Sequence, residues 1–311
     1  MTESRSSRPI DFSDPQVVGQ LQIWGSTTLI ATSFPVGEAI ASGLDPAVLT
    51  FWRFVFAALG FALIIHLTYG LALPPRRTLL KYGVISLTMG FFFWAMFEAL
   101  RYTTALNAGT IFVLMPGLSA VYSYFIVGER LNRAKLAALA IGAVGAVWVV
   151  FRGDLDRMLA LDLNRGDVIF FIACLVMALY TPILKRFHTG EPAAQVTFWT
   201  FVLASGWLFL LTNQRLWTVD YAAVESSVYW GLLYLVVVTT IISGYLFQAA
   251  VLKIGANKAA AYYYVNPVLV VAIDWAVGKG LPPLKVLPGV AITLLATLIL
   301  QRGSNTILRK P

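Results

Sequence analysis

Two prolines at matching places in the two halves of the chain are the first residues with a chemical consequence. Pro116 and Pro267 lie near the middle of apolar stretches. Each lacks an amide hydrogen and clashes with the preceding turn, so the carbonyls of Phe112 and Tyr263, four residues earlier, lose their helical partner. In a bilayer such backbone is tolerated only beside other protein groups or a water-filled cavity. The pattern predicts two broken helices that line a central cavity, with ordinary helix kinks as the alternative.

Neutral polar and aromatic side chains accompany these prolines. Trp94 lies opposite Tyr245 when the halves are aligned, and Tyr263 and Asn266 are spaced to share one helical face. Such groups offer stacking area and hydrogen bonds to a small amphipathic or zwitterionic solute. The predicted solute-binding residues are Trp24, Thr28, Trp94, Thr110, Tyr180, Tyr245, Gln248, Tyr263 and Asn266, and the predicted helix-breaking or gating residues are Gly90, Pro116 and Pro267. Packing in the core is the alternative for each aromatic residue in this set.

Charged residues are rare inside the apolar stretches, which restricts the chemistry. Arg53 is the deepest, with Glu38 as its candidate partner; the alternative is that Arg53 extends to the headgroups. Asp274 has Lys279 as a candidate partner, and no carboxylate falls at the predicted midplane, so no proton relay is evident. The single cysteine, Cys174, and the two separated histidines predict neither a disulfide nor a metal site. Without clustered acids or a phosphate-binding Gly-rich loop, an integral membrane transferase and an ATP-driven pump are disfavoured.

The composition requires membrane-spanning helices to position these residues. Of 311 residues, 59% are hydrophobic and 12% are charged, and the mean hydropathy is +0.76. A soluble protein carries about 25% charged residues, so the soluble class is excluded and an all-α integral membrane protein is expected. Each crossing of a bilayer core takes about 20 residues. We expect ten transmembrane helices, at 17–37, 47–69, 80–100, 105–127, 134–151, 167–187, 193–213, 227–251, 257–277 and 285–301.

The distribution of Lys and Arg predicts the orientation in the membrane. With ten spans both termini lie on one side; 15 of the 23 basic residues fall on that side, seven fall on the other, and Arg53 lies within a span. Short cytoplasmic loops carry the excess of basic residues, so we expect both termini in the cytoplasm and a multi-pass protein of the inner membrane. The net charge of +8 does not indicate nucleic-acid binding, because dense basic runs with interleaved aromatics are missing.

The two halves of the chain resemble each other. After an acid–proline pair the chain reads TFWRFV over 50–55 and TFWTFV over 197–202, and the segments that end at Pro116 and Pro267 align without gaps. Each half holds five spans, so the second copy enters the membrane from the opposite face and the repeats are inverted. The expected organisation is a tail at 1–16, a first repeat at 17–151, a connecting loop at 152–166, a second repeat at 167–302 and a tail at 303–311. Two inverted repeats around a central cavity permit alternating access, which favours a transporter.

Over residues 16–302 the chain resembles the EamA branch of the drug/metabolite transporter superfamily. The motifs that carry the resemblance are Trp24-Gly25-Ser26, the stretch from Asp45-Pro46 to Arg53, ALRYTTALNAGT with Pro116, Gly128-Glu129-Arg130-Leu131, and GAVGAVWVV. The resemblance implies a ten-helix carrier of inverted repeats, with many members that export amino acids or other small metabolites. This chain departs from the family pattern at Gly278-Lys279-Gly280, where a Gly-Glu pair is frequent.

The sequence therefore predicts a secondary transporter that moves a small polar or zwitterionic metabolite across the inner membrane by alternating access, with amino-acid export as the leading activity. The expected partners are a small-molecule substrate and the lipid bilayer, without cofactor or metal, and we expect a monomer. The alternatives are a membrane transferase, a non-transporting scaffold and, within transport, a carrier of an anionic metabolite that an inward-facing Arg53 would bind.

Overall fold

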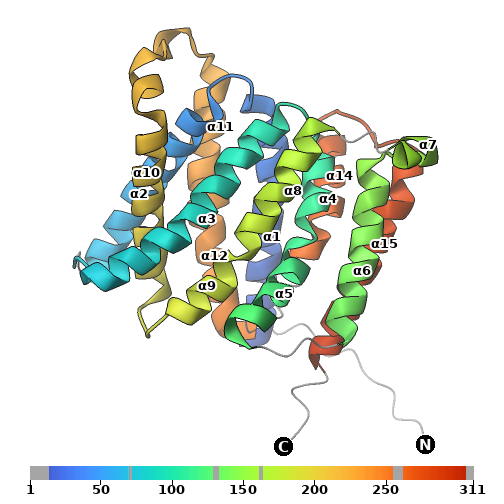
Figure 1. The fold of residues 1–311 in the computed structure, drawn as a ribbon, viewed down its shortest axis with the longest axis horizontal. Helices are drawn as coiled ribbons and strands as arrows, with labels where there is room; N and C mark the ends of the chain where they lie inside the picture. The colour runs from blue at the N-terminus through green and yellow to red at the C-terminus, as the bar shows by residue number, and fades with distance from the viewer. Residues whose placement is uncertain are drawn as a thin grey trace, which may run out of the picture.

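Helices arranged side by side make up the described structure (Figure 1). A computed structural model describes residues 14–68, 70, 72–128, 133–160, 164–254 and 262–305. Within these ranges there is no β-strand, and six helical segments are long and apolar enough to cross a membrane, with shorter apolar helices beside them. The expectation of an all-α membrane protein is confirmed.

The helices follow the predicted spans closely. The first half contains α1 (Pro15–Ile40), α2 (Pro46–Thr68), α3 (Arg76–Leu100), α4 (Ala105–Phe112), α5 (Met115–Val127), α6 (Arg133–Val150) and α7 (Leu155–Leu159). The second half contains α8 (Arg165–Ala178), α9 (Tyr180–Phe187), α10 (Ala193–Thr218), η1 (Tyr221–Ala223), α11 (Ser226–Val236), η2 (Val237–Ile242), α12 (Ser243–Ile254), η3 (Tyr262–Val265), α14 (Asn266–Ala276), η4 (Leu284–Val286) and α15 (Leu287–Asn305). Every predicted span overlaps at least one of these helices, whereas the short helix α7 falls in the predicted connecting loop.

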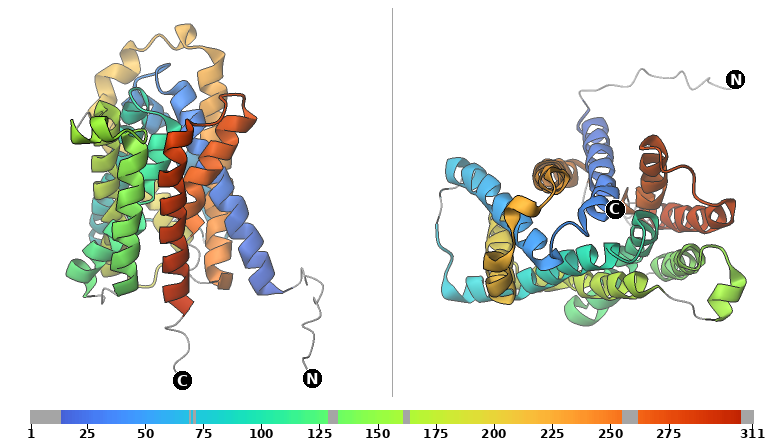
Figure 2. Two further views of the ribbon diagram at one scale, coloured as in Figure 1. Left: turned by 90° about the vertical axis from the view of Figure 1, so that its right-hand side faces the viewer. Right: turned by 90° about the horizontal axis from the view of Figure 1, so that it is seen from above.

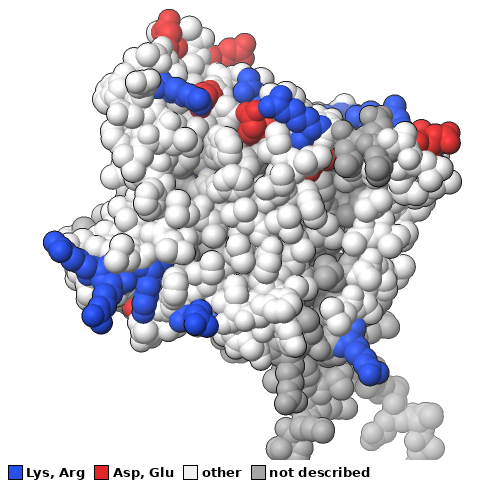
Figure 3. Space-filling view, viewed as in Figure 1, with Lys and Arg blue, Asp and Glu red and all other residues white. Residues whose placement is uncertain are grey.

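The first and last helices place the two ends of the bundle on one face. α1 begins and α15 ends on this side, called here the terminal face, whereas α1 ends and α15 begins on the opposite face (Figure 2). In the view of Figure 3, Lys and Arg dominate near the terminal face, both signs of charge occur near the opposite face, and a nearly uncharged band lies between them. A band of this kind is what a bilayer core requires, because charged groups are costly there.

The two acid–proline pairs begin their helices in different ways. Asp45 accepts hydrogen bonds from the backbone N–H groups of Ala47 and Val48, at 3.0 and 3.3 Å, and so caps α2. At the start of α10, the carboxylate of Glu191 instead accepts from the backbone N–H and the hydroxyl of Thr189. The sequence repeat therefore preserves the position of these two helix starts but not their capping contacts.

Helices of one half pack mainly against helices of the other half. α1 packs along α12, α3 along α8, α2 along α10, and α6 along α15. A cluster of buried aromatic side chains fills the centre and includes Phe34, Phe92, Phe97, Phe112 and Phe170. Several of these rings meet edge to face or tilted, with centroids 5.6 to 6.1 Å apart, a favourable geometry for aromatic pairs. The cluster joins α1, α3, α4 and α8, which lie next to the polar groups described below.

Candidate functional site

A helix begins next to each of the two mirrored prolines. α4 ends at Phe112, and the N–H groups of Val113 and Leu114 donate to carbonyls only three residues earlier, at 3.1 and 3.0 Å. α5 then begins at Met115, with Pro116 as its second residue. In the second half, η3 gives way to α14 at Asn266, and Pro267 is again the second residue. A proline fits there because the first amide groups of a helix have no partner within it. The gating role of both prolines stays a prediction.

Two polar side chains near these helices are buried without hydrogen-bond partners. Asn266, the first residue of α14, is fully buried, and neither its amide nitrogen nor its amide oxygen has a partner in the described part of the chain. The hydroxyl of Thr27 in α1 is likewise buried and unpaired there. α1 packs against α14, so both groups belong to one pair of neighbouring helices. Buried polar groups in native proteins are almost always satisfied, so these two mark places where a ligand or water would bind.

Arg53 is the most deeply buried cation of the described structure, with an exposed fraction of 2%. Its Nε donates to Thr240 Oγ1 at 3.3 Å, and its Nη2 donates to the hydroxyls of Thr239 and Thr240, both at 3.2 Å. The guanidinium carbon lies 4.4 Å from the centroid of the Phe93 ring. The remaining nitrogen, Nη1, has no hydrogen-bond partner among the described residues. Arg53 therefore lies inside the bundle rather than reaching toward the headgroups.

The two threonines face Arg53 because the chain forms a π-helix at this point. In η2, the hydroxyls of Thr239 and Thr240 both donate to the carbonyl of Leu235, four and five residues earlier, at 2.8 Å. The wider turn of a π-helix brings these consecutive hydroxyls to one carbonyl and leaves their oxygens free to accept from the guanidinium. Single π-turns within α-helices frequently occur at functional sites.

The predicted pair of Glu38 with Arg53 is wrong. Glu38 instead accepts a hydrogen bond from Lys279, whose Nζ also lies 3.5 Å from Asp274, as the sequence predicts for that second pair. Burial lowers the pKa of Lys279, but the hydrogen bond and charge of Glu38, together with Asp274, outweigh burial and raise it. The cluster of Glu38, Asp274 and Lys279 joins the end of α1 to the end of α14 at the opposite face.

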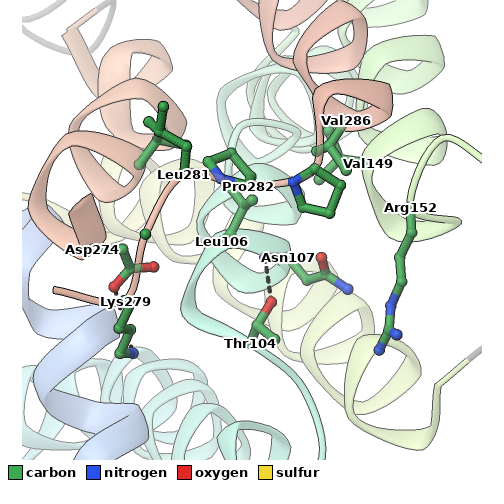
Figure 4. Close-up of a pocket in the computed structure, with 13 residues that line it drawn as sticks. Thr104, Leu106, Asn107, Val149, Arg152, Asp274, Lys279, Leu281, Pro282 and Val286 are labelled. Carbon is green, nitrogen blue, oxygen red and sulfur yellow. Dashed lines mark hydrogen bonds and ion pairs between the residues drawn. The ribbon is translucent and has the colours of Figure 1, made fainter.

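A cavity of about 370 Å³ with mixed polar and apolar walls, called here the polar cavity after its charged lining residues, opens on the same face (Figure 4). Its lining includes Thr104, Asn107, Arg152, Asp274 and Lys279, together with apolar residues of the loop that precedes α15. Figure 4 shows side chains of both charge signs on its walls, with Arg152 on the side away from Lys279. A solute that carries both a positive and a negative group would find partners for each in this cavity.

The other predicted binding residues lie in varied surroundings. Gly90 and Trp94 line an apolar cavity of about 380 Å³ between α3 and α10, together with Trp207. Thr110 is buried and donates to the carbonyl of Leu106 at 2.8 Å, so its hydroxyl proton is used within its own helix. Trp24 is exposed and meets the Tyr262 ring edge to face, and Tyr245 has an exposed fraction of 66%. Thr28 and Tyr180 are half-buried. The side chains of Gln248 and Tyr263 lie outside the described residues.

Comparison with known proteins identifies the family. The sequence profile of the EamA-like transporter family matches residues 17–151 and 164–302. The chain belongs to this family. It is 24% identical to the uncharacterized transporter YyaM of Bacillus subtilis over 277 residues, which cover 88% of this chain and 90% of YyaM. It is 28% identical to a probable terminal-alkyne amino-acid exporter of Streptantibioticus cattleyicolor over 207 residues, 63% of this chain and 64% of that exporter.

A solved crystal structure has the same fold. Its TM-score is 0.65 at 18% sequence identity, and the match covers 94% of this chain and 98% of the other. Together with the apolar helices, the family assignment makes this protein a multi-pass membrane transporter of the EamA type.

One buried cluster in this EamA-like transporter was not expected from the sequence. Asp167, at the start of α8, is 3% exposed and accepts hydrogen bonds from the hydroxyl of Thr103 and from the amide of Asn107, the latter at 3.2 Å to each carboxylate oxygen. The signal in the sequence that could have indicated this cluster is the spacing of two polar residues. Thr103 comes just before the predicted span 105–127, and Asn107, four residues later, lies inside it. The cluster ties α8 to the start of α4, beside the polar cavity.

Proposed function

We propose that this protein is a secondary transporter that exports a small polar or zwitterionic metabolite, an amino acid in the first instance, by alternating access. The observation that carries the proposal is that the two halves meet through equivalent residues. Phe54 of TFWRFV and Phe201 of TFWTFV occupy the same place in their repeats, and their ring centroids lie 5.4 Å apart. A residue that contacts its own equivalent lies on a two-fold axis.

A close contact between two glycines joins α6 and α15, the last long helices of the two halves. A methyl group at Gly145 would lie 2.8 Å from the carbonyl oxygen of Gly289, and one at Gly289 would lie 2.8 Å from the carbonyl oxygen of Gly145. Each glycine also meets the residue four positions beyond its partner, Thr293 or Val149. The two helices run in opposite directions between the faces (Figure 1). A two-fold axis that relates antiparallel helices lies in the membrane plane, which supports inverted repeats.

Contacts away from the axis obey the same relation. When Pro35 is aligned with Pro182, Gly19 corresponds to Gly166, and the alignment of Pro116 with Pro267 pairs Thr103 with Ile254. Gly19 packs closely on Ile254, and Gly166 packs closely on Thr103. The first helix of each half thus contacts the third helix of the other half. Because the contacts of the two halves are equivalent, each half can adopt the conformation of the other, which is the physical basis of alternating access.

The substrate path is proposed to run along α1, α14 and the interrupted helices. Asn266 and Thr27 supply unpaired hydrogen-bonding groups, and the polar cavity beside Lys279 serves as the portal at the opposite face. The excess of Lys and Arg at the terminal face supports a cytoplasmic position for it in the inner membrane (Figure 3). The exporter of Streptantibioticus cattleyicolor supports amino acids as the first substrates to test.

Counterflow in proteoliposomes that contain only the purified protein tests this function. Liposomes preloaded with unlabelled L-threonine, L-leucine or L-phenylalanine are expected to accumulate the labelled form saturably, whereas protein-free liposomes are not. Asn266→Ala should reduce uptake, and Asn213→Ala, on the exposed side of α10, is the matched control. A folded protein that exchanges none of the three amino acids would contradict the proposed substrate class.

A further inference from the structure

We infer that Arg53 binds the carboxylate of the transported solute, so that a carboxylate is a requirement for transport. This inference rests on the proposed function and names the chemical group that the transporter selects. It starts from a charge that lacks a counter-ion. The described hydrogen-bond partners of Arg53 are neutral threonines, and no Asp or Glu forms an ion pair with it in the described ranges. A buried charge without a partner is unfavourable, so it is retained where an anion arrives during the working cycle.

The surroundings of the guanidinium leave one edge for a ligand. Phe93 covers one face of the group, and the hydroxyls of Thr239 and Thr240 occupy Nε and Nη2. The hydrogens of the buried and unpaired Nη1 lie in the guanidinium plane. A carboxylate is planar and accepts in-plane hydrogen bonds from arginine, so its shape matches the open edge.

Arg53 also lies near the middle of the bundle, where the solute must bind in both conformations of a transporter. The next residue, Phe54, contacts its repeat equivalent Phe201, so Arg53 is adjacent to the proposed two-fold axis in the membrane plane. Its own equivalent is Thr200, a buried threonine that donates to the carbonyl of Val196 at 2.7 Å. The two repeats therefore place a single cation beside the axis.

A single cation limits the charge of the solute. Apart from Arg53, no Lys or Arg is buried in the described part of the chain. A phosphate monoester carries close to two negative charges at neutral pH and is usually held by several cationic groups. One guanidinium with one open edge suits a monocarboxylate, either as a zwitterion or as a simple acid.

The site is closed in this conformation and lies between elements of both halves. Phe93 belongs to α3 of the first half, whereas Thr239 and Thr240 belong to η2 of the second half. Relative movement of the halves would expose Nη1 to a solute in the central path. Binding of a carboxylate is thus linked to the movement that alternating access requires.

Competition on the wild-type protein provides the first test. In the counterflow assay above, each unlabelled amino acid is compared with its amide, which keeps the amine and side chain but lacks the carboxylate. We expect the amides to compete at least about 30-fold more weakly, as the loss of a hydrogen bond to a charged group implies. Equal competition by amides would overturn the inference and leave the proposed function intact. Absence of counterflow for all three amino acids would instead contradict the proposed function.

Variants of Arg53 provide the second test. Arg53→Gln is expected to lower the uptake of amino acids about 30-fold or more. Arg53→Lys keeps the charge but lacks the planar set of guanidinium N–H donors, so its uptake should lie between that of Arg53→Gln and that of the wild type. Arg101→Gln, at an exposed pair with Glu98, is the control and should transport like the wild type. Unchanged uptake by folded Arg53→Gln would overturn the inference. If Arg53→Gln does not fold, the competition with amides on the wild type still decides.

Chloride is the other anion that could occupy the guanidinium. Replacement of chloride by methanesulfonate, which has no carboxylate, on both sides of the membrane should leave amino-acid uptake unchanged if the solute carboxylate is the ligand. A loss of uptake in methanesulfonate, together with equal competition by amides, would assign Arg53 to an inorganic anion and overturn the inference.

Discussion

Gly145 and Gly289 offer a direct test of the close packing between α6 and α15. A methyl group at either position would lie 2.8 Å from a backbone carbonyl oxygen, whereas favourable contacts begin at about 3.5 Å. The helices must then separate by roughly 0.7 Å, and overpacking of this kind costs about 1–3 kcal/mol. The gain of about 1 kcal/mol in helix propensity on going from Gly to Ala acts in the other direction. A control must therefore carry the same propensity gain without the clash.

Gly206→Ala in α10 is that control, because no atom lies within 4 Å of the added methyl group. We expect Gly145→Ala and Gly289→Ala to unfold at similar temperatures, both roughly 2–10 °C below Gly206→Ala. The double variant should lose less unfolding free energy than the two single variants lose together, because one separation of the helices relieves both clashes. Heating in detergent with a maleimide dye reports unfolding, because Cys174 is the single cysteine and is buried. Single variants as stable as the control would refute the close contact between the two helices.

Four further outcomes are expected. Pro116→Ala and Pro267→Ala should restore regular helices and reduce transport at normal expression, and parental transport by both variants would contradict the gating role. Lys279→Gln should free the end of α14 from α1 and speed cross-linking between cysteines introduced on the two sides of the polar cavity. An unchanged rate would argue that the cluster of Glu38, Asp274 and Lys279 does not hold the two helices together. Hydrogen bonds from Thr189 lower the pKa of the Glu191 carboxyl to about 2. Its contribution to folding stability is therefore present above the ordinary pKa of 4.5 and is lost as the pH falls toward 2. In Thr189→Val, the pKa of this carboxyl measured by carbon-13 NMR titration should return toward 4.5. A phosphatase fused to the C-terminus should be inactive, whereas activity would place the terminal face outside.

Much of the fold follows from local properties of the sequence. The long apolar stretches predicted the helices to within a few residues, because the exclusion of charge from a bilayer acts on each segment separately. Pro116 marked the break between α4 and α5 for a similar reason, since a missing amide hydrogen acts on the turn that contains it, and Pro267 lies at the start of α14. The family resemblance depends on ordered motifs and was confirmed by the match over both halves.

The partners of individual side chains were decided only by the tertiary structure. Glu38 and Arg53 were candidates for one ion pair, yet Glu38 binds Lys279 and Arg53 binds two threonines that a π-helix turns toward it. Nothing in the apolar stretch around Thr239 indicates a π-turn, and in the structure this turn contacts α1 and α2.

The same limit applies to the residues around the candidate site. Trp94 lines an apolar cavity beside α10, and its contact with a solute stays a prediction, whereas the buried contacts of Asp167 were missed. Helical periodicity defines which residues share a face, but the neighbour of that face depends on how helices from the two halves pack. The sequence by itself therefore determined the helices, their interruptions and the family, and tertiary packing determined which polar groups are left without a partner inside the bundle.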